Sequence, residues 1–89
     1  MKKVMNDVAF DTVSYVVSGF QQIEIYDREN INDENPVLVY KGLMKDYNSL
    51  HAEITRGYSQ YKIGRSMVHK IEIKDNVMVF TLQMKYEEY

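Results

Sequence analysis

The sequence predicts an α+β domain in which a four-stranded, mainly antiparallel sheet carries one or two helices. Three observations lead to this fold class: an alternating apolar pattern in residues 22–27, a matched pair of alternating segments around Asp75-Asn76, and two stretches with helical spacing. The expected order is helix, strand, strand, helix, strand, strand. Since 89 residues suffice for one hydrophobic core, we expect a single domain over residues 1–89.

The first element is expected to be a helix within residues 6–20. Its apolar stripe is formed by Val13, Val16, Val17 and Phe20, and Gly19 is a candidate stop. The β-branched side chains in this stretch oppose the assignment, because they lose rotamer freedom in a helix. We therefore leave the start of this helix open.

Two strands are expected next. Residues 22–27 alternate, with Ile23 and Ile25 on one face and Gln22, Glu24 and Tyr26 on the other. Residues 28–36 are polar and predict a loop. Residues 37–40, continuing towards Met44, predict a second strand paired antiparallel with the first.

The second half of the chain predicts a helix and a hairpin. Residues 46–56 place Tyr47, Leu50 and Ile54 on one helical stripe, whereas residues 58–66 show no clear period. Asp75-Asn76 is a two-residue turn, since both residue types tolerate positive φ. The turn pairs its flanking residues on an apolar face, namely Ile73 with Met78, Ile71 with Phe80, His69 with Leu82 and Met67 with Met84.

Composition excludes several classes of site. Without cysteine there is no disulfide, thiolate metal site or cysteine nucleophile, and a reducing, cytoplasmic location is expected. We expect no secretory signal, because the first ten residues lack an apolar stretch, and no membrane contact, because no segment approaches the ~20 apolar residues of a span.

Catalytic and cofactor motifs are absent from the sequence. His69 is expected on the apolar face of the hairpin as a core residue, and His51 is expected to face solvent. The acidic loop beginning at Asp27 fails the calcium-loop pattern, which needs glycine and glutamate where Asn32 and Leu38 stand. No glycine arrangement fits a phosphate loop, so we expect neither an enzyme nor a bound cofactor or metal.

Charge and tyrosine are unevenly distributed. Residues 20–54 contain seven acidic and three basic residues, whereas residues 55–74 contain one acidic and five basic residues. Residues 56–65 interleave cations with aromatic rings, which is the chemistry that follows a phosphate backbone and stacks bases. The acidic half carries Tyr26 and Tyr40, which suit a protein-binding surface equally well.

The segments IEIYD, VLVYKG and VHKIEIKDNVMVFTL together resemble short proteins of phages and mobile elements of Gram-positive bacteria. This class includes small inhibitors of CRISPR nucleases. The resemblance spans residues 22–82 and consists mostly of structural motifs. It implies a non-enzymatic module that binds a host protein, such as a defence effector, and blocks its nucleic-acid-binding surface.

Two candidate surfaces follow from these patterns. For an inhibitor that mimics phosphates, the expected contact residues are Glu24, Tyr26, Asp27, Glu29, Asp33 and Glu34. The alternative is a small nucleic-acid-binding accessory protein, whose contact residues are Arg56, Tyr58, Tyr61, Lys62 and Arg65. The sequence leaves open which of the two surfaces is functional, which partner binds and what the oligomeric state is.

Overall fold

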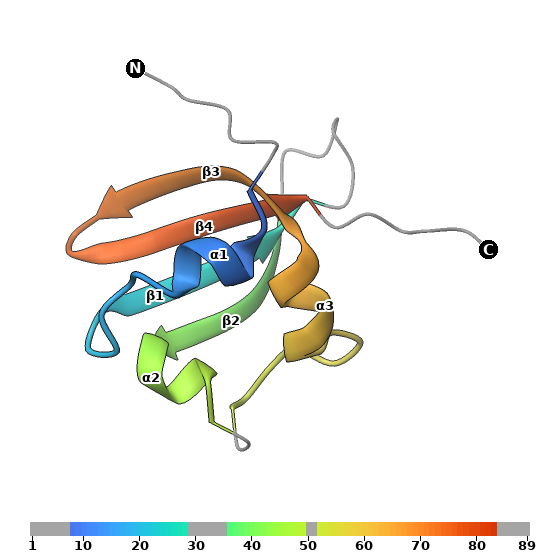
Figure 1. Ribbon diagram of the computed structural model, residues 1–89, viewed down its shortest axis with the longest axis horizontal. Helices are drawn as coiled ribbons and strands as arrows, with labels where there is room; N and C mark the ends of the chain where they lie inside the picture. Colours follow the sequence, from blue (N-terminus) through green and yellow to red (C-terminus); the bar gives the residue numbers. More distant parts are fainter. Residues whose placement is uncertain (1–7, 29–35, 50–51, 84–89) are drawn as a thin grey trace.

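A computed structural model of the chain describes residues 8–28, 36–49 and 52–83. Its elements, in chain order, are α1 (Phe10–Ser14), β1 (Gln22–Asp27), β2 (Val37–Leu43), α2 (Met44–Tyr47), α3 (Gln60–Arg65), β3 (Met67–Lys74) and β4 (Val77–Gln83). The four strands form one sheet in the order β2-β1-β4-β3, and the three short helices lie against the same face of it (Figure 1). The predicted α+β class is confirmed.

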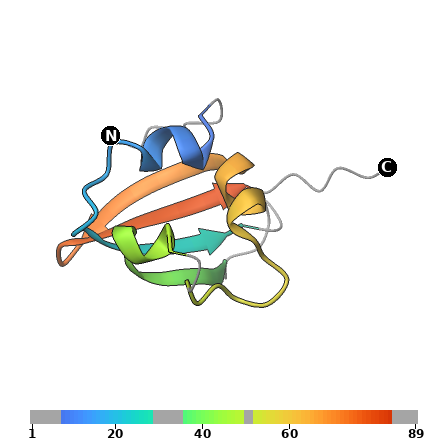
Figure 2. The same cartoon turned by 60° about the horizontal axis from the view of Figure 1, so that its bottom comes forward.

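The sheet is mixed. β1 pairs antiparallel with β2, and β3 pairs antiparallel with β4, as predicted. The two hairpins meet through a parallel pair, β1 with β4, which places Ile25 beside Phe80. A turned view shows the helices covering one side of this sheet (Figure 2). None of the helices described is long and apolar enough to cross a membrane.

The core lies between the sheet and the helices. Ile23 and Ile25 of β1 are fully buried, as their alternation predicts, and Phe80 packs edge-on against Phe10 of α1 with 5.0 Å between ring centroids. Tyr47 of α2 packs in the same way on Phe10 at 5.6 Å. Three helices of four to six residues are therefore stabilised by tertiary packing rather than by helix propensity.

The C-terminal hairpin confirms the predicted turn but not the whole register. Asp75 and Asn76 have φ angles of 51° and 66°, which is the left-handed geometry of a tight hairpin turn. Pairing follows the prediction from Lys74 back to Lys70, and then a β-bulge shifts it. Val68, rather than His69, lies opposite Leu82 and is fully buried. The prediction of a core histidine at this position is wrong.

A second bulge occurs between Ile25 and Tyr26 of β1 and their partners on β2. The extra residue is Val39 of β2. Because the bulge interrupts the alternation of this strand, the neighbouring residues Val39 and Tyr40 are both buried. Tyr40 is only 4% exposed, which removes it from the tyrosines available to a partner. The ring also folds back over Gly42, where any Cβ would meet its hydroxyl at 2.6 Å.

The helices differ most from the sequence prediction. α1 ends at Ser14, well short of residue 20, and Val16 and Phe20 from its predicted stripe are exposed. α2 ends at Tyr47. Ile54 lies outside any helix, in a segment where the N–H of Thr55 donates to the carbonyl of Val39 on β2 at 3.0 Å. Leu50 and His51 lie outside the described residues.

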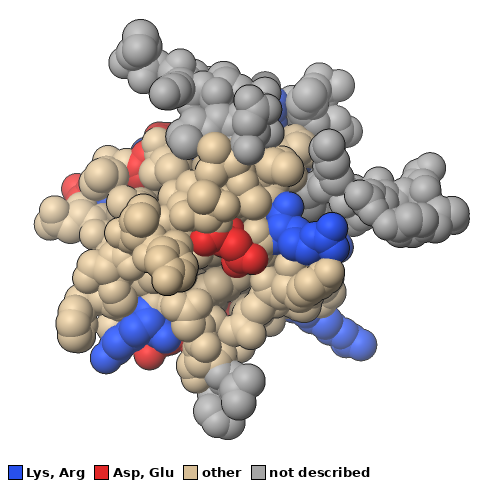
Figure 3. Space-filling view, viewed as in Figure 1, with Lys and Arg blue, Asp and Glu red and all other residues tan. Residues whose placement is uncertain are grey.

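α3 forms in the segment without a clear period. Its N-cap is Ser59, whose hydroxyl accepts a hydrogen bond from the N–H of Lys62 at 3.1 Å. Only Ile63 and Gly64 of this helix are buried, which is too few for a periodic pattern. Figure 3 shows the helix-bearing face: it is mostly neutral, and its charged side chains form small separate groups.

Candidate functional site

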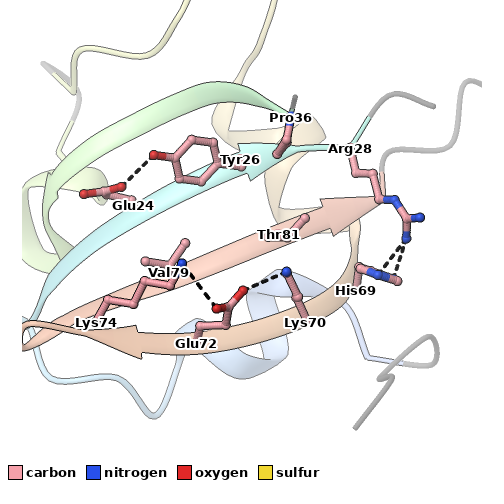
Figure 4. Close-up of a pocket in the computed structure, with 10 residues that line it drawn as sticks. All are labelled: Glu24, Tyr26, Arg28, Pro36, His69, Lys70, Glu72, Lys74, Val79 and Thr81. Carbon is pink, nitrogen blue, oxygen red and sulfur yellow. Dashed lines mark hydrogen bonds and ion pairs between the residues drawn. The ribbon is translucent and has the colours of Figure 1, made fainter. Parts of the chain in front are cut away.

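The other face of the sheet carries a shallow depression of about 450 Å³. We call this surface the open sheet face. Its lining residues come from β1, β3 and β4, together with Arg28 and Pro36, which flank positions 29–35 (Figure 4). They are Glu24, Tyr26, Arg28, Pro36, His69, Lys70, Glu72, Lys74, Val79 and Thr81. The surface holds two carboxylates and three permanent cations, so its charge is nearly balanced.

The strand register sets the arrangement of these side chains. Alternation on β1 turns Glu24 and Tyr26 away from the core, as the sequence predicts. Across the sheet, Glu24 aligns with Val79 and then Glu72 on one side and with Lys41 of β2 on the other, so two carboxylates and a cation lie in one row. Tyr26 aligns with Thr81 and then Lys70. Thr81 is only 5% exposed, because it lies on a central strand between these larger side chains.

Hydrogen bonds and ion pairs hold the polar side chains in place. The hydroxyl of Tyr26 donates to the carboxylate of Glu24 at 2.7 Å, and this bond raises the pKa of Tyr26 above its ordinary value. Glu72 accepts from Lys70 at 2.7 Å and lies 3.4 Å from the ammonium of Lys74. The hydrogen bond from Lys70 holds the pKa of Glu72 below its ordinary value.

Arg28 and His69 form the end of the open sheet face. A guanidinium nitrogen of Arg28 lies 2.6 Å from Nε2 of His69. Because a guanidinium only donates hydrogen bonds, the imidazole nitrogen is the acceptor in this contact. The bulge in β3 allows this contact, because the strand register skips His69 while Val68 takes the position opposite Leu82. His69 is therefore a surface residue bonded to an arginine.

The predicted acidic surface is only partly assembled in the structure. Glu24 and Tyr26 lie side by side on the open sheet face (Figure 4). Asp27 faces the opposite way, is 0% exposed, and accepts a hydrogen bond from the hydroxyl of Tyr58 at 2.8 Å. Its burial is incompatible with the predicted surface role, and it follows from the alternation that also buries Ile23 and Ile25. Glu29, Asp33 and Glu34 lie outside the described residues.

The predicted basic surface is divided in a similar way. Tyr58 is half-buried through its bond to Asp27, and the ammonium of Lys62 lies 5.5 Å from the centre of its ring. Tyr61 is 72% exposed, and Arg65 both donates to its hydroxyl at 2.7 Å and lies 5.3 Å from its ring. Arg56 is exposed in the turn before α3. Tyr58, predicted for the basic surface, is thus hydrogen-bonded to the buried Asp27, which was predicted for the acidic surface.

Several residues of the open sheet face were not predicted as site residues. The polar face of the hairpin, with Lys70 and Glu72, was visible in the sequence pattern. Nothing in the pattern placed this hairpin beside β1, so no sequence feature joined these residues to Tyr26. In the described part of the chain, no three histidine, aspartate or glutamate side chains gather as a candidate metal site.

Comparison with known proteins adds no assignment: no protein-family model, curated protein or solved structure matches the chain.

Proposed function

We propose that this protein is a non-enzymatic protein-binding module and that the open sheet face is its contact surface. The observation that carries the proposal is the set of paired, nearly charge-balanced side chains around Tyr26 on the side of the sheet that bears none of the described helices.

The charge of this surface favours a protein partner over nucleic acid. A phosphate-binding groove needs cations that are free of carboxylates. Here Glu72 forms ion pairs with both Lys70 and Lys74, and Glu24 adds a second carboxylate opposite Lys41 of β2. Protein surfaces carry charges of both signs and suit such a mixed pattern.

Preorganisation supports the same conclusion. Binding a partner costs roughly 0.5–1.5 kcal/mol for each flexible side chain that must be immobilised. On the open sheet face, Tyr26 is already held by its hydrogen bond to Glu24, and Lys70 by its ion pair with Glu72. Tyr26 also offers an aromatic ring with a polar end, a residue type that often dominates interface energies.

The resemblance to phage proteins extends this proposal to the kind of partner. We propose that the partner is a nucleic-acid-binding effector of a host defence complex, as in small inhibitors of CRISPR nucleases. Phosphate mimicry is the weaker part of this idea, because Asp27 is buried and Glu24 is the acidic member that the described residues expose. Contact through the mixed open sheet face does not require mimicry.

The test is affinity capture of the partner from host lysate, followed by binding measurements with purified components. The variant Tyr26→Ala with Glu72→Lys removes the aromatic ring and reverses one charge at exposed or half-exposed positions. We expect it to weaken binding by ~30-fold or more, the loss typical of a hot-spot residue. The matched variant Arg56→Glu with Lys62→Glu changes the helix-bearing side and should bind nearly normally. Equal affinities for wild type and the Tyr26/Glu72 variant would refute the proposed surface.

A second candidate function is nucleic-acid binding through α3 and the preceding turn. The observation in its favour is the exposed Tyr61 ring held by Arg65, which together offer a flat stacking surface beside Lys62. A salt-dependent mobility shift of labelled DNA or RNA by the purified protein alone would support this function. Tyr61→Ala should then remove ~1–3 kcal/mol per stacked base. Absence of any shift at low salt would exclude it.

A further inference from the structure

The loop between α1 and β1 exposes three large apolar side chains. Tyr15 is 91% exposed, Val16 82% and Phe20 81%. Single exposed apolar residues are ordinary, but three within six residues form a patch of the kind that marks an interaction site. We call residues 15–20 the apolar loop.

Backbone contacts fix the apolar loop against α2. The N–H of Lys45 donates to the carbonyl of Gly19, and the N–H of Met44 donates to that of Gln21, both at 2.9 Å. The ammonium of Lys45 lies 5.3 Å from the centre of the Phe20 ring. The apolar side chains are therefore presented outwards from an anchored backbone, which lowers the entropy cost of binding.

A depression of about 520 Å³ lies beside the apolar loop, between α1 and α2. Val17 and Met44 supply apolar lining, and Tyr15 belongs to both the loop and the depression. Asp11 of α1 and Lys45 of α2 line it with opposite charges. A projecting apolar group and a hollow thus lie next to each other on one surface, with charges of both signs.

We propose that this surface binds a second copy of the same chain about a two-fold axis. Two-fold association requires a self-complementary surface, because each copy offers the same residues to the other. Rotation about such an axis directs the apolar loop of each copy to the depression of the other and brings Asp11 of each copy towards Lys45 of the other. An anionic lipid surface fits less well, because it would be repelled by Asp11 and by the exposed Asp46 of α2.

The self-association is independent of the proposed function. The apolar loop and its depression lie with the helices, whereas the open sheet face lies on the other side of the sheet. A dimer formed in this way leaves both open sheet faces accessible and presents them to one partner assembly together.

Sedimentation equilibrium of the full chain, from micromolar to millimolar concentration, tests the proposal. Wild type should show a reversible monomer–dimer equilibrium. Phe20→Ser, at an exposed position, should raise the dimer dissociation constant by ~30-fold or more, as expected for a hot-spot aromatic. Ile73→Ser is the matched control, since Ile73 is 70% exposed but lies on β3 outside the depression. A monomeric wild type, or loss of the dimer in Ile73→Ser, would overturn the proposal.

Charge reversal tests the two-fold arrangement itself. Asp11→Lys and Lys45→Asp should each weaken self-association by ~10-fold, because each places like charges together twice in a symmetric dimer. An equimolar mixture of the two variants should form a heterodimer with an affinity near that of wild type. If both variants fold, as checked by circular dichroism, and the mixture stays monomeric, the proposed arrangement is wrong. If Asp11→Lys does not fold, the comparison of Phe20→Ser with Ile73→Ser decides the matter.

Discussion

The bulge at His69 makes a prediction that separates two registers of the C-terminal hairpin. Val68 is 0% exposed and lies opposite Leu82, whereas His69 lies at the surface against Arg28. Truncating Val68 to alanine removes two buried methyl groups, worth ~0.8 kcal/mol each by transfer. The cavity left in the core raises the total to about 2–3 kcal/mol.

Truncating His69 to alanine removes its contact with Arg28 and a half-buried ring that lies outside the core cluster. We expect a loss of about 1 kcal/mol or less. For a domain of this size, a change of 1 kcal/mol shifts the melting temperature by ~4–8 °C. Val68→Ala should therefore melt ~8–24 °C below wild type, and His69→Ala should melt at most ~8 °C below it.

Thermal unfolding followed by circular dichroism, with urea titration as a second measure, distinguishes the two outcomes. A hairpin without the bulge would place His69 in the core and turn Val68 outwards, so the order of the two effects would reverse. A loss for His69→Ala that equals or exceeds the loss for Val68→Ala would show that the register described here is incorrect.

Three further predictions concern the core. Burial raises the pKa of Tyr47, and its hydroxyl has no hydrogen-bond partner among the described residues, so Tyr47→Phe should stabilise the fold by ~1 kcal/mol. Because folding favours the neutral phenol of Tyr47, the free energy of unfolding is unaffected by ionisation of this group below the ordinary tyrosine pKa of 10.0 and falls as pH rises above it. Urea titrations below and above that pH should therefore show a smaller alkaline loss of stability in Tyr47→Phe than in wild type. A double-mutant cycle with Asp27→Asn and Tyr58→Phe should give a coupling of ~1.5–3 kcal/mol, and additive effects would contradict the buried hydrogen bond. Ile71→Asp should cost at least ~3 kcal/mol and Lys70→Asp less than ~1 kcal/mol, and equal melting temperatures would contradict the placement of Ile71 against the core.

The elements that the sequence predicted best are those held by local rules. The strand at residues 22–27 was predicted within its observed bounds, because Ile23 and Ile25 alternate with polar neighbours. The turn at Asp75-Asn76 followed from the tolerance of these residues for positive φ. Both features depend on residues close together in the chain.

The helices were predicted poorly for a physical reason. α1, α2 and α3 have four to six residues each, which is less than two turns, so no apolar stripe repeats often enough to reveal them. Val16 and Phe20 matched a helical stripe but lie in the exposed apolar loop. In α3 the cap by Ser59 was the one local indication of a helix start.

The candidate site was half visible in the sequence. The outward placement of Glu24 and Tyr26 followed from alternation, and the polar face of the last hairpin followed from its turn. The inclusion of Asp27 in the surface was wrong, because the same alternation turns it into the core, where one carboxylate oxygen accepts a hydrogen bond from Tyr58.

The sequence by itself determined the α+β class, the strand at residues 22–27 and the C-terminal hairpin turn, because each depends on the periodicity or φ preferences of neighbouring residues. Only the tertiary structure decided that β1 lies parallel beside β4, since that pairing joins residues more than fifty positions apart and no local pattern encodes it. The same pairing brings Tyr26 next to Thr81 and Lys70 and so creates the open sheet face. The bulge that frees His69 for Arg28 was likewise decided by packing, because burying Val68 is more favourable than burying an imidazole.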